Sequence, residues 1–185
     1  MLISRFTDND VREKIMSMEQ RYGIILPAQY RDFLHRYNGG YTPKTRFRAG
    51  KISSDVRGFF GLGNVGLSME TIELKEWLEN GIFPVACDSF GNYMAIGLSD
   101  EKEGKIYFCD HEKGYKAEYI AASLRDFCKC CKSERISEAS RKTIQEREKD
   151  LIAAGRGNII TDDLRRMWQA EIDKYGDMMQ EEVCI

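Results

Sequence analysis

The segment from Phe47 to Tyr119 constrains the fold most, because short β-like runs follow one another there with glycines and polar turns between them. The runs read TRFRAG, VRGFFGLG, FPVACD, NYMAIGL, KIYFCDH and AEYIAA. β-Branched and aromatic residues in runs of this length are typical of strands. The residues DSFGN at 88–92 join the third run to the fourth and favour a tight turn. We therefore expect a largely antiparallel sheet with hairpin connections.

Helical patterns lie on both sides of these runs. Two apolar stripes at helical spacing precede them, one made of Val11, Ile15, Met18 and Tyr22 and the other of Tyr30, Phe33, Leu34 and Tyr37. Gly23 follows the first stripe, and Asn38-Gly39-Gly40 follows the second, as expected for helix ends. A further helix is expected over 68–81, among the strands, and another begins after the N-cap Ser123. This order of elements predicts an α+β fold.

The last fifty residues differ from the rest of the chain. SEASRKTIQEREKDLIAAGRG predicts a charged helix, and a second helix begins after Thr161 as N-cap. The apolar stripe of this second helix consists of Leu164, Met167, Trp168, Ile172 and Tyr175. Such a stripe has to be buried, either on the preceding domain or on a partner. We expect an α+β domain over 1–133 and a helical C-terminal extension over 134–185, packed on or beside it.

Composition narrows the class of protein. The chain of 185 residues carries 28 Lys and Arg against 30 Asp and Glu, a net charge of -2 that argues against a dedicated nucleic-acid binder. The N-terminal stretch lacks the apolar core of a secretory signal, and no run of 18 apolar residues predicts a membrane span. Six cysteines without an export signal indicate reduced thiols. We expect a cytoplasmic protein that binds neither membranes nor nucleic acid directly.

Four side chains that can bind metals stand in a row at 109–112, in the sequence CDHE. Zinc could in principle be held by Cys109, His111, Cys128 and Cys131, although the spacing differs from that of a zinc knuckle. A hydrolase would need His111 as its base, since His35 lies within a helical pattern, and no nucleophile-elbow motif is present. The simpler interpretation is a strand end, where Asp110 hydrogen-bonds the following turn and Gly114 completes it.

An ordered set of motifs resembles the SUKH superfamily, which includes bacterial relatives of the yeast cell-wall-synthesis regulator. The set consists of YGIILPAQYRDFLHRYNGG, GFFGLG, FPVACDSFGNYMAIGL, GKIYFCDHE and IAASLRDF, and it runs over about residues 8 to 133. The residues that match the family pattern are Leu26, Pro27, Tyr30, Asn38, Gly39, Gly40, Asp88, Gly91, Asn92, Asp110 and His111.

The resemblance implies helices packed on a twisted, mostly antiparallel sheet. It also implies an immunity protein that binds and neutralises a cognate bacterial toxin, often a nuclease or deaminase, without enzymatic activity, metal or cofactor. On this basis we expect a toxin recognition rim at one edge of the sheet, formed by Asp88, Asn92, Asp110, His111 and Glu112. A basic nuclease partner would favour the acidic stretches 99–104 and 177–183 as further contacts.

Two other functions are compatible with the sequence. One is a regulatory or scaffold module of the same fold that is unconnected with toxins. The other, from a different class, is a metal-dependent or cysteine-dependent hydrolase that uses His111 with nearby thiols.

Overall fold

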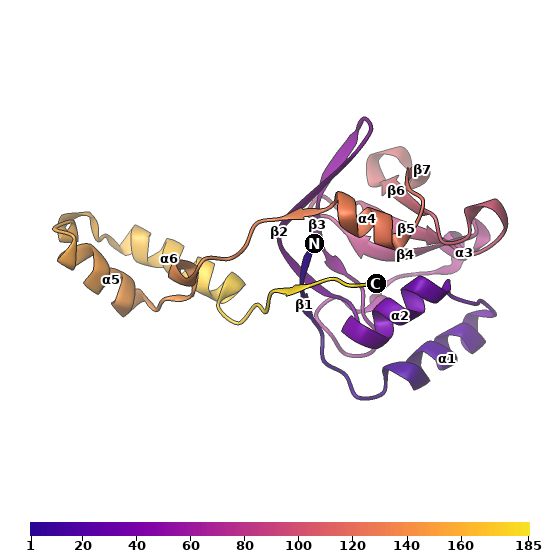
Figure 1. Cartoon of the computed structure of the whole chain (residues 1–185), viewed down its shortest axis with the longest axis horizontal. Coiled ribbons are helices and arrows are strands. Elements are labelled where there is room, and N and C mark those ends of the chain that lie inside the picture. Colours follow the sequence, from indigo (N-terminus) through magenta and orange to yellow (C-terminus); the bar gives the residue numbers. More distant parts are fainter. The chain divides into compact units, whose positions relative to one another are not determined.

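A nine-stranded sheet forms the centre of the computed structural model, which describes residues 1–185 (Figure 1). Its strands are β1 (Leu2–Arg5), β2 (Gly40–Ala49), β3 (Ile52–Phe59), β4 (Ile82–Cys87), β5 (Tyr93–Gly97), β6 (Ile106–Asp110), β7 (Lys116–Ala121), β8 (Lys132–Ser133) and β9 (Glu181–Glu182). They lie in the order β7-β6-β5-β4-β3-β2-β1-β9, and β8 also pairs with β2. Every pair of neighbouring strands is antiparallel, so the predicted α+β fold on a mostly antiparallel sheet is confirmed.

Helices cover both faces of the sheet, and two further helices lie in the C-terminal segment. They are α1 (Val11–Tyr22), α2 (Ala28–Tyr37), α3 (Lys75–Glu79), α4 (Leu124–Cys130), α5 (Ile144–Ala153) and α6 (Asp162–Tyr175). Single 3-10 turns occupy Met69–Thr71, Asp100–Lys102, His111–Lys113, Glu138–Arg141 and Gly157–Ile159. The prediction of a single helix over 68–81 is wrong, because this stretch contains only a 3-10 turn and the five-residue α3. None of the helices is both long enough and apolar enough to cross a membrane.

The main core lies between the sheet and the helices α1, α2 and α4. Both predicted N-terminal stripes face this core, and Phe33 packs on Phe59 of β3 with ring centroids 4.9 Å apart. Phe127 of α4 contacts both Phe47 and Phe59. The aromatic side chains thus join α2 and α4 to the central strands, and we call this side of the sheet the core face.

The opposite side of the sheet, the outer face, carries a smaller apolar cluster. Ile82, Ala95 and Cys109 are buried there, on β4, β5 and β6. Directly opposed residues of antiparallel neighbours share a face, and Tyr93 of β5 lies opposite both Cys87 and Cys109. Trp77 of α3 packs over this cluster. Only the short helix α3 contributes to the apolar cluster on this face.

The two helix ends predicted before β2 are confirmed. Gly23 and Asn38 adopt the left-handed conformation at the ends of α1 and α2. Gly39 also has a positive φ of 76°, and a Cβ at this position would lie 2.6 Å from the backbone of residues 59–61. The chain therefore needs glycine here, where the residue before β2 passes close to the end of β3.

Three strands have no counterpart in the sequence prediction. β1, β8 and β9 are two to four residues long, and each forms only by pairing with a distant segment. The C-terminal residues after β9 are held by Tyr37, whose hydroxyl accepts from the backbone N–H of Cys184 at 2.8 Å, and by Arg36, which donates to the Cys184 carbonyl. Both termini of the chain therefore lie at this edge of the sheet (Figure 1).

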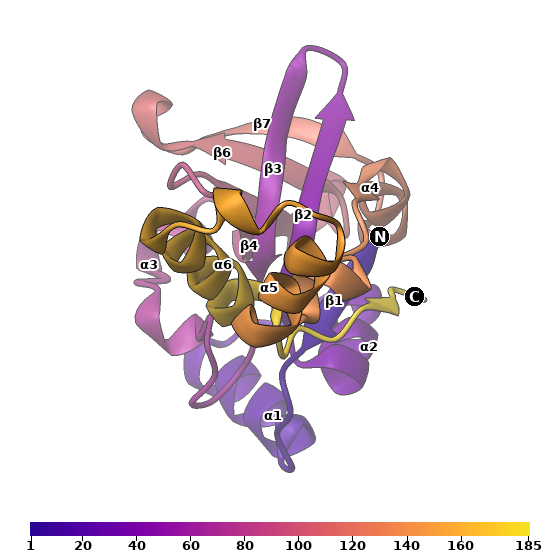
Figure 2. The same cartoon turned by 90° about the vertical axis from the view of Figure 1, so that its left-hand side faces the viewer.

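The chain divides into two compact units. The first comprises Met1–Glu134 together with Glu181–Ile185, and it contains the whole sheet. The second comprises Arg135–Gln180. The residues 181–185, which the sequence assigned to the extension, thus belong to the first unit. Within it, the hairpin of β2 and β3 forms a long two-stranded arm (Figure 2).

The second unit is held together by caps and polar contacts. A capping box joins Thr143 and Glu146 at the start of α5, and Thr161 caps α6 as predicted. Its buried residue is Arg147, which pairs with Glu171 at 2.8 Å and lies over the ring of Trp168. No apolar side chain in this unit is fully buried. The apolar stripe of α6 therefore keeps part of its surface exposed.

Candidate recognition site

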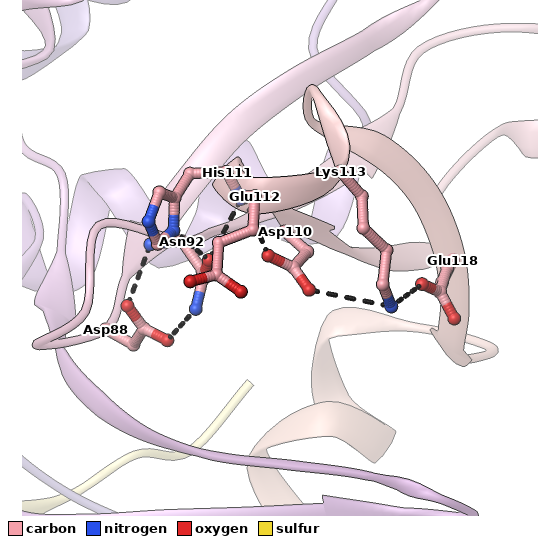
Figure 3. Close-up of polar contacts among 7 residues, drawn as sticks. All are labelled: Asp88, Asn92, Asp110, His111, Glu112, Lys113 and Glu118. Carbon is pink, nitrogen blue, oxygen red and sulfur yellow. Dashed lines mark hydrogen bonds and ion pairs between the residues drawn. The ribbon is translucent and has the colours of Figure 1, made fainter.

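The five residues of the predicted recognition rim meet at one end of β4, β5 and β6 (Figure 3). Asp88 follows β4 and Asn92 precedes β5, so the two flank a tight hairpin turn. Asp110 ends β6, and His111 and Glu112 begin the next 3-10 turn. Since β5 and β6 are neighbours in the sheet, with Tyr93 opposite Cys109, the two turns lie side by side.

Asp88 is the centre of the hydrogen-bond network at this site. It is buried, and one carboxylate oxygen accepts from the backbone N–H groups of Phe90 and Asn92, each at 2.8 Å. The other oxygen accepts from Ser54 Oγ at 2.6 Å and from Asn92 Nδ2 at 2.7 Å. Four donors therefore compensate for the burial of this carboxylate. They also close the DSFGN turn, in which Gly91 has a φ of 91°.

Asn92 carries the network from Asp88 to His111. Its Nδ2 donates to Asp88, which fixes the orientation of the side-chain amide. Its Oδ1 therefore faces His111, accepting from the backbone N–H at 3.0 Å and lying 2.8 Å from Nδ1. Because an amide oxygen can only accept, Nδ1 of His111 carries the proton of this contact. In the neutral form of the ring, the lone pair therefore lies on Nε2.

Asp110 organises the adjoining turn in the way that the sequence predicts. Its Oδ1 accepts from the backbone N–H of Glu112 at 3.0 Å, and Gly114 ends the turn in the left-handed conformation. Lys113 Nζ lies 2.9 Å from Glu118 and 3.5 Å from Asp110. The hydrogen bond to Glu118, with the charges of both carboxylates, raises the pKa of Lys113. The strand-end role expected for Asp110 is confirmed.

The rim residues differ in what they offer to a partner. Asp88 and Asn92 are buried and use their polar atoms within the turn. Asp110 is half-buried, whereas His111 and Glu112 are exposed. The buried pair therefore holds the two turns in place, and the exposed side chains of the rim are those of His111 and Glu112.

The row of metal-ligand types at 109–112 does not form one cluster. Cys109 is fully buried in the apolar cluster of the outer face, and burial raises its pKa to about 12. Cys128 and Cys131 are buried in the main core, whereas His111 is exposed. No group of three His, Cys, Asp or Glu side chains is arranged to hold a metal ion. The thiols required by the zinc and hydrolase interpretations are thus separated from His111.

The outer face holds an aromatic cluster that the sequence prediction missed. Trp77, Tyr93 and Tyr115 pack together with ring centroids 5.2 to 5.5 Å apart, and Tyr107 lies 6.2 Å from Tyr119. We call these five residues the outer aromatic cluster. The alternation within NYMAIGL and KIYFCDH places Tyr93 and Tyr107 on one face and was a usable signal. Trp77 and Tyr115 join them only through tertiary structure.

Comparison with known proteins defines the class to which this fold and site belong. The family model SUKH_6, described as SMI1-KNR4 cell-wall, matches residues 12–128. The chain therefore belongs to the SUKH family, which includes toxin immunity proteins. A similar protein is the SPbeta prophage-derived uncharacterized protein YokK of Bacillus subtilis (strain 168), 26% identical over 148 residues that cover 66% of this chain and 75% of the relative. No solved structure gives a significant match.

Proposed function

We propose that this chain is an immunity protein that neutralises a cognate bacterial toxin, a nuclease or another toxin directed at nucleic acid, by direct stoichiometric binding. The observation that carries the proposal is the SUKH_6 match over residues 12–128, since members of this family bind toxins. The chain then acts by binding alone, without chemistry, cofactor or metal.

The geometry of the recognition rim supports this role. A buried carboxylate and a buried amide hold the exposed His111 in one orientation and one tautomer. Side chains ordered before binding lose less conformational entropy when a partner arrives. In this proposal His111 and Glu112 contact the toxin, while Asp88, Asn92 and Asp110 fix the turns that carry them.

Co-expression tests the proposal. The chain is produced together with the toxin domain encoded beside its gene, and growth is compared with that of cells carrying the toxin domain alone. We expect restored growth and a one-to-one complex in size-exclusion chromatography with light scattering. A complex without protection would favour the regulatory module. The absence of both complex and protection would refute the proposed function.

Two histidines allow a matched test of the rim. His111→Ala and His35→Ala each remove one exposed imidazole, but His35 lies on α2, away from the two rim turns. We expect only His111→Ala to raise the Kd for the toxin domain, with both variants keeping the melting temperature of the unaltered chain. Equal Kd values for the two variants would remove His111 from the contact surface.

A further inference from the structure

Four basic side chains on the outer face have no acidic partner within the chain. They are Arg46 and Arg48 on β2, Arg57 on β3 and Lys132 on β8, which we call the outer basic cluster. All four are exposed, and none forms an ion pair or a side-chain hydrogen bond. Their charges are therefore available to a partner.

The arrangement of this cluster is unfavourable for the isolated fold. Arg46 lies directly opposite Lys132 on the neighbouring strand, and like charges at such positions repel. Asp55 lies opposite Arg46 on its other side, but its two oxygens accept from the backbone N–H and the hydroxyl of Ser89, at 3.0 and 2.6 Å. Asp55 thus directs its hydrogen bonds to Ser89 and forms no ion pair with Arg46. The fold does not need this repulsion between Arg46 and Lys132 for its stability, which is a reason to look for a binding function.

The outer aromatic cluster lies on the same face of the sheet. Cys87 connects the two clusters, since it is directly opposite Tyr93, and the charges of Arg57 and Asp55 both act on its thiol. The aromatic cluster remains partly open, with Tyr119 57% and Tyr115 40% exposed. Tyr, Trp and Arg are the side chains most enriched among the residues that dominate protein–protein binding energy.

Basic and acidic side chains lie at different strands of the sheet. The basic cluster lies on β8, β2 and β3, whereas the acidic turn 99–104 joins β5 to β6, the strands that carry Tyr93 and Tyr107 of the aromatic cluster. Burial and the neighbouring Tyr119 raise the pKa of Tyr107, and Glu101 of this turn lies close enough to raise it further. Such polarity favours one orientation of a partner.

We propose that the outer face is a second docking surface for the protein partner, and that it binds a carboxylate-rich patch through the outer basic cluster. The inference rests on the proposed function, because it takes the toxin domain as the partner. The aromatic cluster supplies the apolar centre of the contact, and the basic cluster supplies one charged side. A contact of this kind uses an acidic part of the toxin surface, separate from a basic substrate cleft.

Ring packing favours a protein over a single-stranded nucleic acid as the occupant. Base stacking needs free aromatic faces, but Tyr93 is stacked on Phe60 at 5.8 Å and meets Trp77 and Tyr115 edge to face. With a net charge of -2, the chain also lacks the surplus of basic residues that nucleic-acid binders carry.

Paired substitutions test the surface against the toxin domain encoded beside the gene of this chain. Arg48→Glu and Tyr119→Ala change the outer face, while Arg12→Glu and Met16→Ala make matched changes at exposed positions of α1. We expect Arg48→Glu to raise the Kd by about tenfold and to weaken its dependence on salt. Tyr119→Ala should also raise the Kd, and both α1 variants should leave it unchanged. Equal melting temperatures show that all four variants are folded.

The outcomes separate this inference from the proposed function. If the unaltered chain does not bind the toxin domain, the inference and the proposed function are both refuted. If it binds and the outer-face variants bind as tightly as the α1 variants, the docking surface is refuted and the proposed function stands. Fluorescence anisotropy with a labelled (dT)20 oligonucleotide completes the test. Tight binding of this probe by the unaltered chain, lost in Arg48→Glu, would replace the acidic protein by nucleic acid as occupant.

Discussion

The buried carboxylate of Asp88 gives the sharpest prediction about the candidate site. Asp88→Asn keeps the size of the side chain but replaces one acceptor oxygen by an NH2 group. The oxygen that remains can still accept from the backbone of the turn, as Asp88 does now from Phe90 and Asn92. The new NH2 group would then face Ser54 Oγ, which can rotate to accept from it, and Asn92 Nδ2, which can only donate. One hydrogen bond is lost, and a buried donor is left without a partner.

The magnitude follows from these contacts. A hydrogen bond to a charged group contributes about 1.5–3 kcal/mol, and an unpaired buried donor costs about 1–3 kcal/mol. These costs overlap, so we expect Asp88→Asn to lower the free energy of unfolding by about 2–4 kcal/mol. Rotation of the Asn92 amide would relieve the donor–donor contact, but it would then turn Nδ2 toward the N–H groups of His111.

Urea unfolding followed by tryptophan fluorescence measures the effect. A Trp168→Phe background leaves Trp77 as the reporter, and Trp77 packs on Tyr93 in the first unit. With a slope of about 2 kcal/mol/M, the urea midpoint should fall by about 1–2 M. Asp55→Asn is the matched control, because Asp55 accepts from the same turn through exposed contacts with Ser89. Its effect should stay below about 1 kcal/mol.

Two results would contradict this reasoning. An unchanged midpoint for Asp88→Asn would mean that water or a rearranged turn replaces the lost acceptor. An equal loss for Asp55→Asn would mean that burial of the carboxylate does not set the cost. Hydrogen exchange at the backbone amide of His111 provides a local check, since loss of the Asn92 acceptor should accelerate it.

Four further predictions concern the rest of the fold. Because burial raises the pKa of Cys109 to about 12, iodoacetamide at pH 8 should label the exposed Cys130 and spare Cys109 in peptide mass spectra. Unfolded thiols ionise near pH 9, so this burial should make stability fall as pH rises from about 9 toward 12, as urea midpoints would show. Gly39→Ala should lower the free energy of unfolding by more than about 3 kcal/mol, and Gly50→Ala by only about 1–2 kcal/mol. The reason is that a Cβ meets backbone atoms at position 39 and open space at position 50. Similar urea midpoints for the two variants would refute this. Tyr37→Phe removes the acceptor for the Cys184 amide, so hydrogen exchange there should accelerate while the amides of β4 stay protected.

Local sequence signals were sufficient for the elements that carry their own pattern. The stripes of α1 and α2 end at residues that tolerate positive φ, and the DSFGN turn joins β4 to β5 as expected. Short-range hydrogen bonds and hydrophobic periodicity encode such features. The same signals failed over 68–81, where the hydrophobic pattern of one helix is divided between a 3-10 turn and α3.

The candidate site was predictable in membership but not in the roles of its residues. The motif matches placed Asp88, Asn92 and His111 together, and the pairing of β5 with β6 brings them into one network. Sequence could not tell that Asp88 and Asn92 are buried. It could not tell either that Cys109 is buried while His111 is exposed, because burial depends on the strand register and on which face the helices cover.

The sequence by itself determined the antiparallel α+β fold, the family and the two turns of the recognition rim, since each depends on residues near one another in the chain. Tertiary structure alone decided the short strands β1, β8 and β9, which pair with segments more than thirty residues away. It also decided which side chains become neighbours on the outer face, where Arg46 lies opposite Lys132 and Trp77 packs on Tyr115. No local pattern encodes these meetings, because strand pairing across the sheet sets which distant side chains become neighbours.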